Sequence, residues 1–364
     1  MSFLNHIKKL DFLLIFAASA LAIIGIIFIY SACISSGNFF DTWRQIGFFV
    51  FGFLLMIGIS FFDNRTIREN SFLILTLYFL CVLSLVGLFF FAPEIRGIKS
   101  WYRIGPITFD PTELTKIILI ILLAKYFSKR HVELYKIKHI FLSGLYAFIP
   151  SILIFFQPEF GSVMVIVAIW IGILLVSGIK LKDFILLCLL SVLALSLVWS
   201  FLIKDYQRDR MINFINPQEN ALGGNWNSNQ ALIAIGSGGL IGKGLGNGSQ
   251  VQNKFLPEAK TDFIFSVVAE ETGLVGTTAI LSLFGILFWR ILRIALNARS
   301  NFSRLFATGL SISIFFQMFI NIGMNLGLLP VIGLPLPLVS YGGSNIVFTF
   351  IALGLLQNMM ITES

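Results

Sequence analysis

Three charged residues at the edges of apolar runs are the first candidates for chemistry. Glu113 and Lys116 begin one run and are spaced i, i+3, so on a helix they share a face and can pair. Asp262 begins another run, where an apolar setting can raise the pKa of a carboxyl and make it a general base. A lysine held by a carboxylate can also meet a phosphate. Two simpler interpretations stay open: a structural ion pair, and an N-cap at Asp262.

Other candidate residues are weaker evidence for a particular chemistry. The glycine-dense segment 235–248 lacks the spacing of a nucleotide P-loop, which leaves either a flexible loop or a phosphate contact through Lys243. Glu270 and Glu271 lie inside an apolar run, and we expect them to line a polar path or to pair with another helix. The three histidines are all predicted on one side of the membrane, away from Asp262, so the sequence supports neither metal-activated water nor a Ser-His-Asp nucleophile.

The composition requires that these residues be positioned in a membrane. Of 364 residues 57% are hydrophobic and 12% are charged, about half the roughly 25% of soluble domains. This excludes a soluble enzyme, a disordered scaffold and a secreted disulfide framework. It predicts an all-α polytopic membrane protein with one transmembrane domain over residues 1–364. The net charge of +8 is explained by cytoplasmic loops, so no nucleic acid is needed as a partner.

Apolar runs of the length that crosses a bilayer predict about ten transmembrane helices. The runs are continuous rather than alternating, so helices are expected and a barrel is not. A signal peptide is the alternative for the first run, but that run exceeds the usual 7 to 15 residues of a signal core. The predicted spans are 10–33, 44–62, 71–92, 112–128, 139–156, 160–179, 183–203, 262–289, 304–328 and 341–361.

Lysine and arginine gather in one set of loops, which the positive-inside bias makes cytoplasmic. An even number of spans then places both termini in the cytoplasm. The external side receives the segments 93–111, 157–159 and 329–340 and one long loop, about 204–261, between the seventh and eighth spans. That loop combines glycines with Trp226, so we expect it to be ordered and functional.

Eight motifs occur in order on the predicted external side, at 96–101, 110–116, 157–161, 206–210, 230–243, 255–258, 261–265 and 336–344. On these motifs the chain resembles the SEDS (shape, elongation, division and sporulation) family of peptidoglycan glycosyltransferases over essentially its whole length. The segments 321–324 and 330–337 are closer to its RodA-type elongation branch than to its FtsW-type division branch. Departures are Lys260 where the family often has His, Glu159 where it has Asp, and the stretch 219–227.

The resemblance implies that lipid II is both donor and acceptor, in an inverting transfer that releases polyprenyl pyrophosphate during cell elongation. It implies that Asp262 deprotonates the acceptor hydroxyl, and that Lys116, Arg210, Lys243 or a divalent cation (Mg or Mn) meets the leaving-group charge. No cofactor is otherwise expected. The residues expected to bind substrate are Glu113, Lys116, Trp101, Arg96, Glu159, Arg210, Gln230, Lys243, Ser340 and Tyr341.

The resemblance further implies a class B penicillin-binding protein and the elongation machinery as partners. It places the chain in the bacterial cytoplasmic (inner) membrane, with the active site facing outward. Three alternatives stay open: a division-type paralogue, a flippase for the lipid-linked precursor, and a non-catalytic scaffold. Glu270 and Glu271 keep the flippase open, whereas a scaffold would not need Asp262, Glu113 and Lys116 together.

Overall fold

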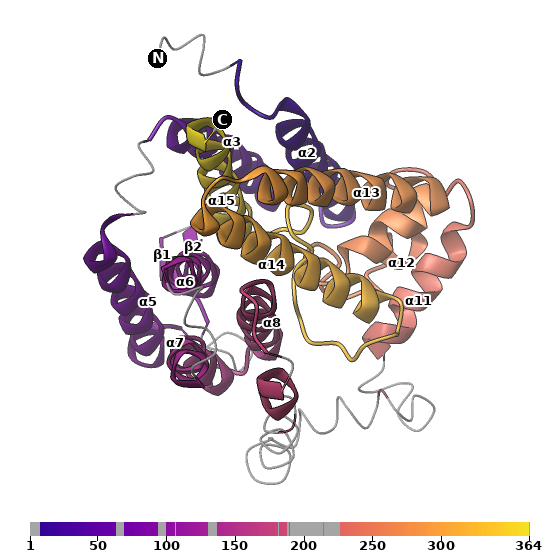
Figure 1. Cartoon of the computed structure of the whole chain (residues 1–364). Coiled ribbons are helices and arrows are strands. Elements are labelled where there is room, and N and C mark those ends of the chain that lie inside the picture. The colour runs from indigo at the N-terminus through magenta and orange to yellow at the C-terminus, as the bar shows by residue number, and fades with distance from the viewer. Residues whose placement is uncertain are drawn as a thin grey trace.

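The computed structural model describes residues 8–62, 69–93, 100–105, 107–129, 137–180, 182–187, 189, 214 and 226–363. Within these residues the chain is almost entirely helical (Figure 1). Nine long helices match nine of the predicted spans: α2 (Phe12–Ile34), α3 (Phe40–Ser60), α5 (Ser71–Phe91), α6 (Pro111–Ser128), α7 (Ile137–Phe156), α8 (Phe160–Val176), α13 (Ile264–Asn297), α14 (Asn301–Asn325) and α15 (Gly343–Glu363).

Seven of these helices are long and apolar enough to cross a membrane, which makes this a multi-pass membrane protein. The other two are α6, which carries Glu113, Lys116 and Lys125, and α8, which has 17 residues. The predicted span at 183–203 lies mostly outside the described residues, so the number ten stays a prediction.

The eighth span was placed too short. It was predicted to end at 289, whereas α13 continues to Asn297. Arg290 and Arg293 stand in its last two turns, and long cationic side chains are tolerated at the edge of a membrane because their charged ends can reach water.

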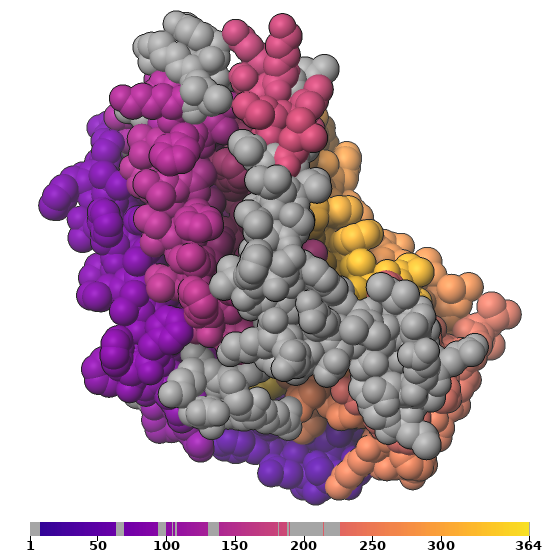
Figure 2. Space-filling view, turned by 90° about the horizontal axis from the view of Figure 1, so that it is seen from below, coloured from indigo at the N-terminus to yellow at the C-terminus, as the bar shows by residue number. Residues whose placement is uncertain are grey.

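Close helix packing builds the core. Phe350 of α15 packs at its ring edge against Phe49 and Phe53 of α3. At Gly354 a Cβ atom would stand 2.7 Å from the carbonyl oxygen of Met56, so only glycine allows this approach of α15 to α3. α13 and α14, which follow each other in the C-terminal part of the chain, lie side by side (Figure 1). Seen from below, α5 and α7 cover one side of the molecule and the C-terminal helices the opposite side (Figure 2).

Shorter elements precede the long helices. The strands β1 (Tyr102–Ile104) and β2 (Ile107–Phe109) form an antiparallel hairpin that leads into α6. The helices α11 (Trp226–Gly238) and α12 (Ser249–Gln252) lead toward α13. All of these lie in segments that were predicted to be external.

The two ends of the bundle can be distinguished by contacts. α2 and α13 run antiparallel, because Ser31 near the end of α2 bonds Glu271, while Asp11 at its start pairs with Arg290. Asp11 also exchanges two hydrogen bonds with Gln357 of α15. We call the end with Asp11 and Gln357 the terminal end, since it holds the first and last described helical turns. The opposite end, with Ser31 and Glu271, is the loop end.

Candidate functional site

Asp262 lies at the loop end, in the turn that precedes α13. The N-cap residue of α13 is Phe263, whose side chain makes no capping hydrogen bond, so the interpretation of Asp262 as the N-cap residue is wrong. The Asp262 side chain is half-buried, and its Oδ2 would stand 3.4 Å from a Cβ atom at Gly333. Because Gly333 adopts a φ of 75°, the loop before α15 can approach this carboxylate closely.

The backbone of Asp262 is held by two asparagines of α14. Asn321 and Asn325 each donate an Nδ2–H to the Asp262 carbonyl oxygen at 2.9 Å. Asn325 Oδ1 accepts bonds from the backbone N–H of Ser266 at 3.2 Å and from its hydroxyl at 2.6 Å. Both asparagines are fully buried. The turn that carries Asp262 is therefore fixed against α14 while its carboxylate stays accessible.

Asn325→Leu is expected to lower the free energy of unfolding by about 1–3 kcal/mol for each buried group that loses its partner. The substitution keeps the size of the side chain but leaves the Ser266 amide without its acceptor. Denaturant or thermal unfolding in detergent measures the change. Asn253→Leu, at an exposed asparagine after α12, is the matched control and should change stability little. Equal losses in both variants would contradict the role of Asn325.

The loop before α15 is latched to the same turn. Ser340 Oγ donates to the Thr261 carbonyl at 2.5 Å and accepts from the Leu336 backbone N–H at 2.8 Å. The Tyr341 backbone N–H donates to the Lys260 carbonyl at 2.8 Å. The Ser340 hydroxyl is thus engaged inside the protein, where it positions the turn. Its predicted contact with substrate stays a prediction, as does that of Tyr341.

Asp41, which the sequence did not single out, pairs with Lys260, two residues before Asp262. Lys260 Nζ lies 2.9 Å from Asp41 Oδ2 at the start of α3. Burial lowers the pKa of Lys260, but the hydrogen bonds that Lys260 donates and the charges of Asp41 and Cys33 together outweigh burial, so the pKa is raised. Burial raises the pKa of the Tyr341 hydroxyl against the opposing effect of Arg44. Asp41 and Arg44 also begin an apolar run, so the criterion that selected Glu113 would have found them.

Glu113 and Lys116 form the predicted ion pair, at 2.8 Å between Glu113 Oε2 and Lys116 Nζ. The Lys116 side chain is 2% exposed. Asn345 of α15 donates to Glu113 Oε1 at 3.0 Å and to Gln317 of α14 at 3.1 Å, so three helices meet at this pair. Lys116 Nζ has no partner with hydrogen-bond geometry among the described residues. A buried ammonium with unused donors is suited to an anion.

Two further carboxylates lie next to this pair, at the ends of helices. Asp110 caps α6 by accepting the Thr112 N–H at 2.8 Å, and Glu159 accepts the Ser162 hydroxyl at 2.6 Å. Burial raises the pKa of Asp110, and the charges of Glu159 and Glu113 raise it further. Burial also raises the pKa of Glu159, against its bond from Ser162. The cluster therefore combines the buried cation Lys116 with two carboxyls, Asp110 and Glu159, whose raised pKa values oppose ionisation.

A Glu159→Gln variant is expected to flatten the dependence of stability on pH. A carboxyl with a raised pKa binds its proton more tightly in the folded state, so stability falls as pH rises from the ordinary pKa of 4.5 through the folded value. Glutamine cannot ionise, so the variant should lose less stability than wild type as the pH rises above 4.5. Melting temperatures across pH measure this, with Glu69→Gln at an exposed site as control. Parallel profiles for wild type and Glu159→Gln would contradict the assignment.

The glycine-dense loop is fastened to α13. The helix is broken at Gly273, and the backbone N–H groups of Lys243 and Gly244 donate to the carbonyls of Glu270 and Glu271. Lys243 Nζ donates to Glu270 Oε1 at 2.8 Å. Glu271 accepts from Ser31 of α2, as the expected pairing with another helix requires. Lys243 is thus held by Glu270, and its contact with a substrate phosphate stays a prediction.

Among the described residues, Trp101 and Gln230 form no hydrogen bond with these carboxylates. Trp101 is half-buried before β1, and Gln230 is buried in α11. Arg96 and Arg210 lie outside the described residues. Within the described ranges no group of three or more His, Cys, Asp or Glu side chains is arranged to hold a metal ion.

An apolar groove adjoins the ion pair. It encloses about 160 Å³ between α5, α6 and α15, and its lining has no polar surface. Leu114 and Ile117, which line it, alternate along α6 with Glu113 and Lys116. Such a groove suits a hydrocarbon chain whose polar end reaches the charged cluster.

The chain matches known proteins along most of its length. Residues 11–364 match the family model FtsW/RodA/SpoVE, described as "Cell cycle protein". Peptidoglycan glycosyltransferase MrdB of Escherichia coli K12 is 35% identical over 87% of this chain and 84% of that protein. Stage V sporulation protein E of Bacillus subtilis 168 is 35% identical over 96% of each chain.

Solved structures of related proteins resemble this chain over almost its whole length. A chain from a work titled "Structural coordination of polymerization and crosslinking by a peptidoglycan synthase complex" superposes with a TM-score of 0.82 and 29% identity, over 97% of this chain and 98% of that one. The rod shape determining protein RodA of Thermus thermophilus gives 0.72 and 28%, over 97% of each chain. With the model matched from residue 11 to the last residue, the chain belongs to the FtsW/RodA/SpoVE family of cell cycle proteins, the SEDS family that its motifs resemble.

Proposed function

We propose that this peptidoglycan glycosyltransferase polymerises glycan strands with lipid II as both donor and acceptor, and that it acts in cell elongation. The observation that carries the proposal is the arrangement of Asp262. Its backbone is clamped by Asn321 and Asn325, and its carboxylate is half-exposed at the loop end. A base fixed by its backbone, with a half-exposed carboxylate that a substrate can reach, is what a proton abstraction from a bound hydroxyl requires.

In the proposed reaction the Asp262 carboxylate takes the proton of the acceptor sugar 4-hydroxyl. The hydroxyl oxygen forms a bond to the anomeric carbon of the donor, while the bond from that carbon to the pyrophosphate oxygen breaks. Attack from the opposite face inverts the configuration, and the leaving group departs as polyprenyl pyrophosphate. One base is sufficient for this displacement, because a pyrophosphate leaves without protonation when cations meet its charge.

Lys116 is the described cation best suited to the leaving group. It is buried, its donors are not all used, and it is followed along α6 by Ile117, which lines the apolar groove of α5, α6 and α15. We propose that the polyprenyl chain lies in this groove while its pyrophosphate reaches Lys116. Arg210, Lys243 and a divalent cation remain the other proposed sources of positive charge.

The elongation role and the partner are finer proposals. MrdB and RodA support elongation, whereas stage V sporulation protein E shows that the family also serves other processes. The related chain in a complex that coordinates polymerization with crosslinking supports a class B penicillin-binding protein as the partner. The positive-inside bias supports the bacterial cytoplasmic membrane, with the loop end facing outward.

The deciding experiment combines the purified chain, its partner and purified lipid II. Glycan strands resolved by gel electrophoresis are the expected product. If wild type formed no polymer while labelled lipid II crossed the bilayer of reconstituted vesicles, the flippase alternative would replace this proposal.

The division alternative is tested in a rod-shaped bacterium depleted of either its elongation or its division enzyme. Rescue of rod shape supports the elongation role, and rescue of septation alone contradicts it.

A further inference from the structure

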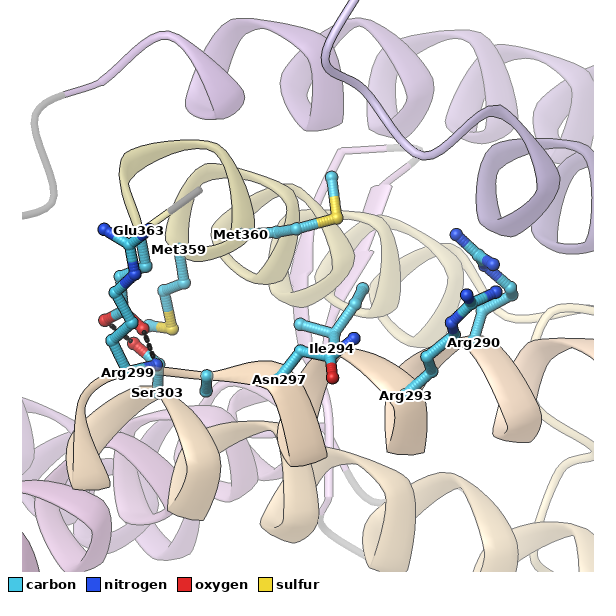
Figure 3. A pocket seen from close by; sticks show the side chains of 10 residues that line it. Arg290, Arg293, Ile294, Asn297, Arg299, Ser303, Met359, Met360 and Glu363 are labelled. Atoms are coloured by element: carbon cyan, nitrogen blue, oxygen red, sulfur yellow. Dashed lines mark hydrogen bonds between the residues drawn. The ribbon is translucent and has the colours of Figure 1, made fainter.

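A second pocket lies at the terminal end of the bundle. It encloses about 440 Å³ where α13 ends, α14 begins and α15 ends. Figure 3 shows Arg290 and Arg293 at one end of it and Arg299 with Glu363 at the other. Arg290 follows Glu270 of the loop end by 20 residues, at most about 30 Å along the helix. The pocket is therefore separated from the candidate site by about the thickness of the hydrocarbon core.

Most charges around this pocket are already engaged. Arg290 is paired with Asp11, at 2.5 Å from its Nη2 and 2.7 Å from its Nε. Glu363 accepts the hydroxyls of Ser300 and Ser303 and two backbone N–H groups at the start of α14, so the helix N-terminus compensates its charge.

Arg293 differs from these residues because its charge is not paired with a carboxylate of the described chain. It has no carboxylate within ion-pair distance in the part of the chain that the structure describes. Its guanidinium lies 5.6 Å from the centre of the Trp289 ring. A positive charge at this pocket thus lacks a counter-charge from the described protein.

The face of α13 that carries Arg293 is apolar and exposed. Trp289, Leu292 and Leu296 are 53%, 47% and 83% exposed, and with Arg293 they follow the spacing of one helix face. On a membrane-spanning helix such a face contacts acyl chains, and tryptophan marks the level of the headgroups. Arg293 therefore lies where hydrocarbon meets headgroup. Ile294 and Met360 give the pocket an apolar floor.

We propose that this pocket binds the phosphate of an anionic phospholipid from the adjacent leaflet, with Arg293 as the main contact. A guanidinium binds a phosphate through two parallel hydrogen bonds, and basic pockets between transmembrane helices receive lipid headgroups. The volume suits a glycerophosphate group. Lys8 and Lys9, both exposed just before α2, add positive charge at the same membrane face. A soluble phosphate would meet the same cations but would not use the apolar face beside them.

The test measures binding of short-chain phosphatidylglycerol to the full-length protein in uncharged detergent, by native mass spectrometry or thermal shift. Wild type should bind phosphatidylglycerol more tightly than phosphatidylcholine of the same chain length. Arg293→Gln should weaken the phosphatidylglycerol Kd about five-fold, while Arg293→Lys should keep part of the selectivity. Binding is read without lipid II, so its outcome is independent of the proposed function.

Two controls decide the assignment. Arg304→Gln removes an exposed arginine of α14 that bonds Asn301 and does not line the pocket, and it should keep the wild-type Kd. Glycerol 3-phosphate at the same concentration should not bind. An unchanged Kd in Arg293→Gln, equal binding of phosphatidylcholine, or full binding of glycerol 3-phosphate would each overturn the proposal, the last by making the occupant a soluble phosphate.

Discussion

Asp262→Asn is expected to lower the rate of glycan polymerisation by about 10²- to 10⁴-fold, the usual contribution of a general base. The amide has the shape of the carboxylate but cannot accept the proton of the attacking hydroxyl. The fold should survive, because the bonds from Asn321 and Asn325 go to the backbone carbonyl of residue 262 and not to its side chain. Initial rates with purified lipid II measure the effect, with melting temperature recorded in parallel.

A matched control separates loss of the base from loss of any carboxylate. Asp183→Asn changes an aspartate beyond the far end of α8, at the opposite face of the bundle from Glu159, and it should polymerise at the wild-type rate. Lipid II should bind Asp262→Asn with nearly the wild-type affinity, since a base acts mainly in the transition state. Normal polymer from Asp262→Asn would remove Asp262 from the mechanism.

Lys116→Met is expected to have the second large effect, on both stability and activity. It leaves Glu113 buried without its counter-ion, and breaking a buried pair in this way costs about 3–5 kcal/mol. It also removes the buried cation proposed for the leaving group. Unfolding in detergent and polymerisation rate are measured on the same preparations.

The double variant Glu113→Gln/Lys116→Met distinguishes a structural pair from a functional cation. With both charges gone no unpaired charge is buried, so most of the lost stability should return. Asn345 can still bond the side-chain oxygen at residue 113. Activity should stay low, because the pyrophosphate still lacks its cation. Recovery of activity together with stability would make the pair structural only, the simpler interpretation that the sequence left open.

Lys243 illustrates how a tertiary contact changes the meaning of a sequence pattern. Its place in a glycine-dense segment left open either a flexible loop or a phosphate contact. In the structure its ammonium bonds Glu270, and the glycines let the loop approach the broken turn of α13. At Gly242 a Cβ atom would stand 2.2 Å from the Glu271 carbonyl oxygen. Lys243 does bind an anionic group, but among the described residues that group is Glu270 of the same chain.

Asp262 shows the converse. Nothing local distinguished a helix N-cap from a base, because both place an aspartate before an apolar helix. The structure excludes the cap because α13 begins after Phe263. Asn321 and Asn325, about 60 residues further along the chain, then hold the Asp262 carbonyl and fix the turn before the helix. A contact of this sequence separation leaves no periodic signal, so a single sequence cannot predict it.

By itself the sequence determined the membrane class, the positions of nine long helices and the pairing of Glu113 with Lys116. These depend on local quantities, namely the transfer of apolar side chains into lipid and the 3.6-residue period of a helix. Only the tertiary structure decided that Asp262 is no cap, that Ser340 latches its turn, and that Arg293 stands by a pocket at the terminal end of the bundle. Those features arise where distant segments pack together, and the free energy of such contacts depends on geometry that exists only after folding.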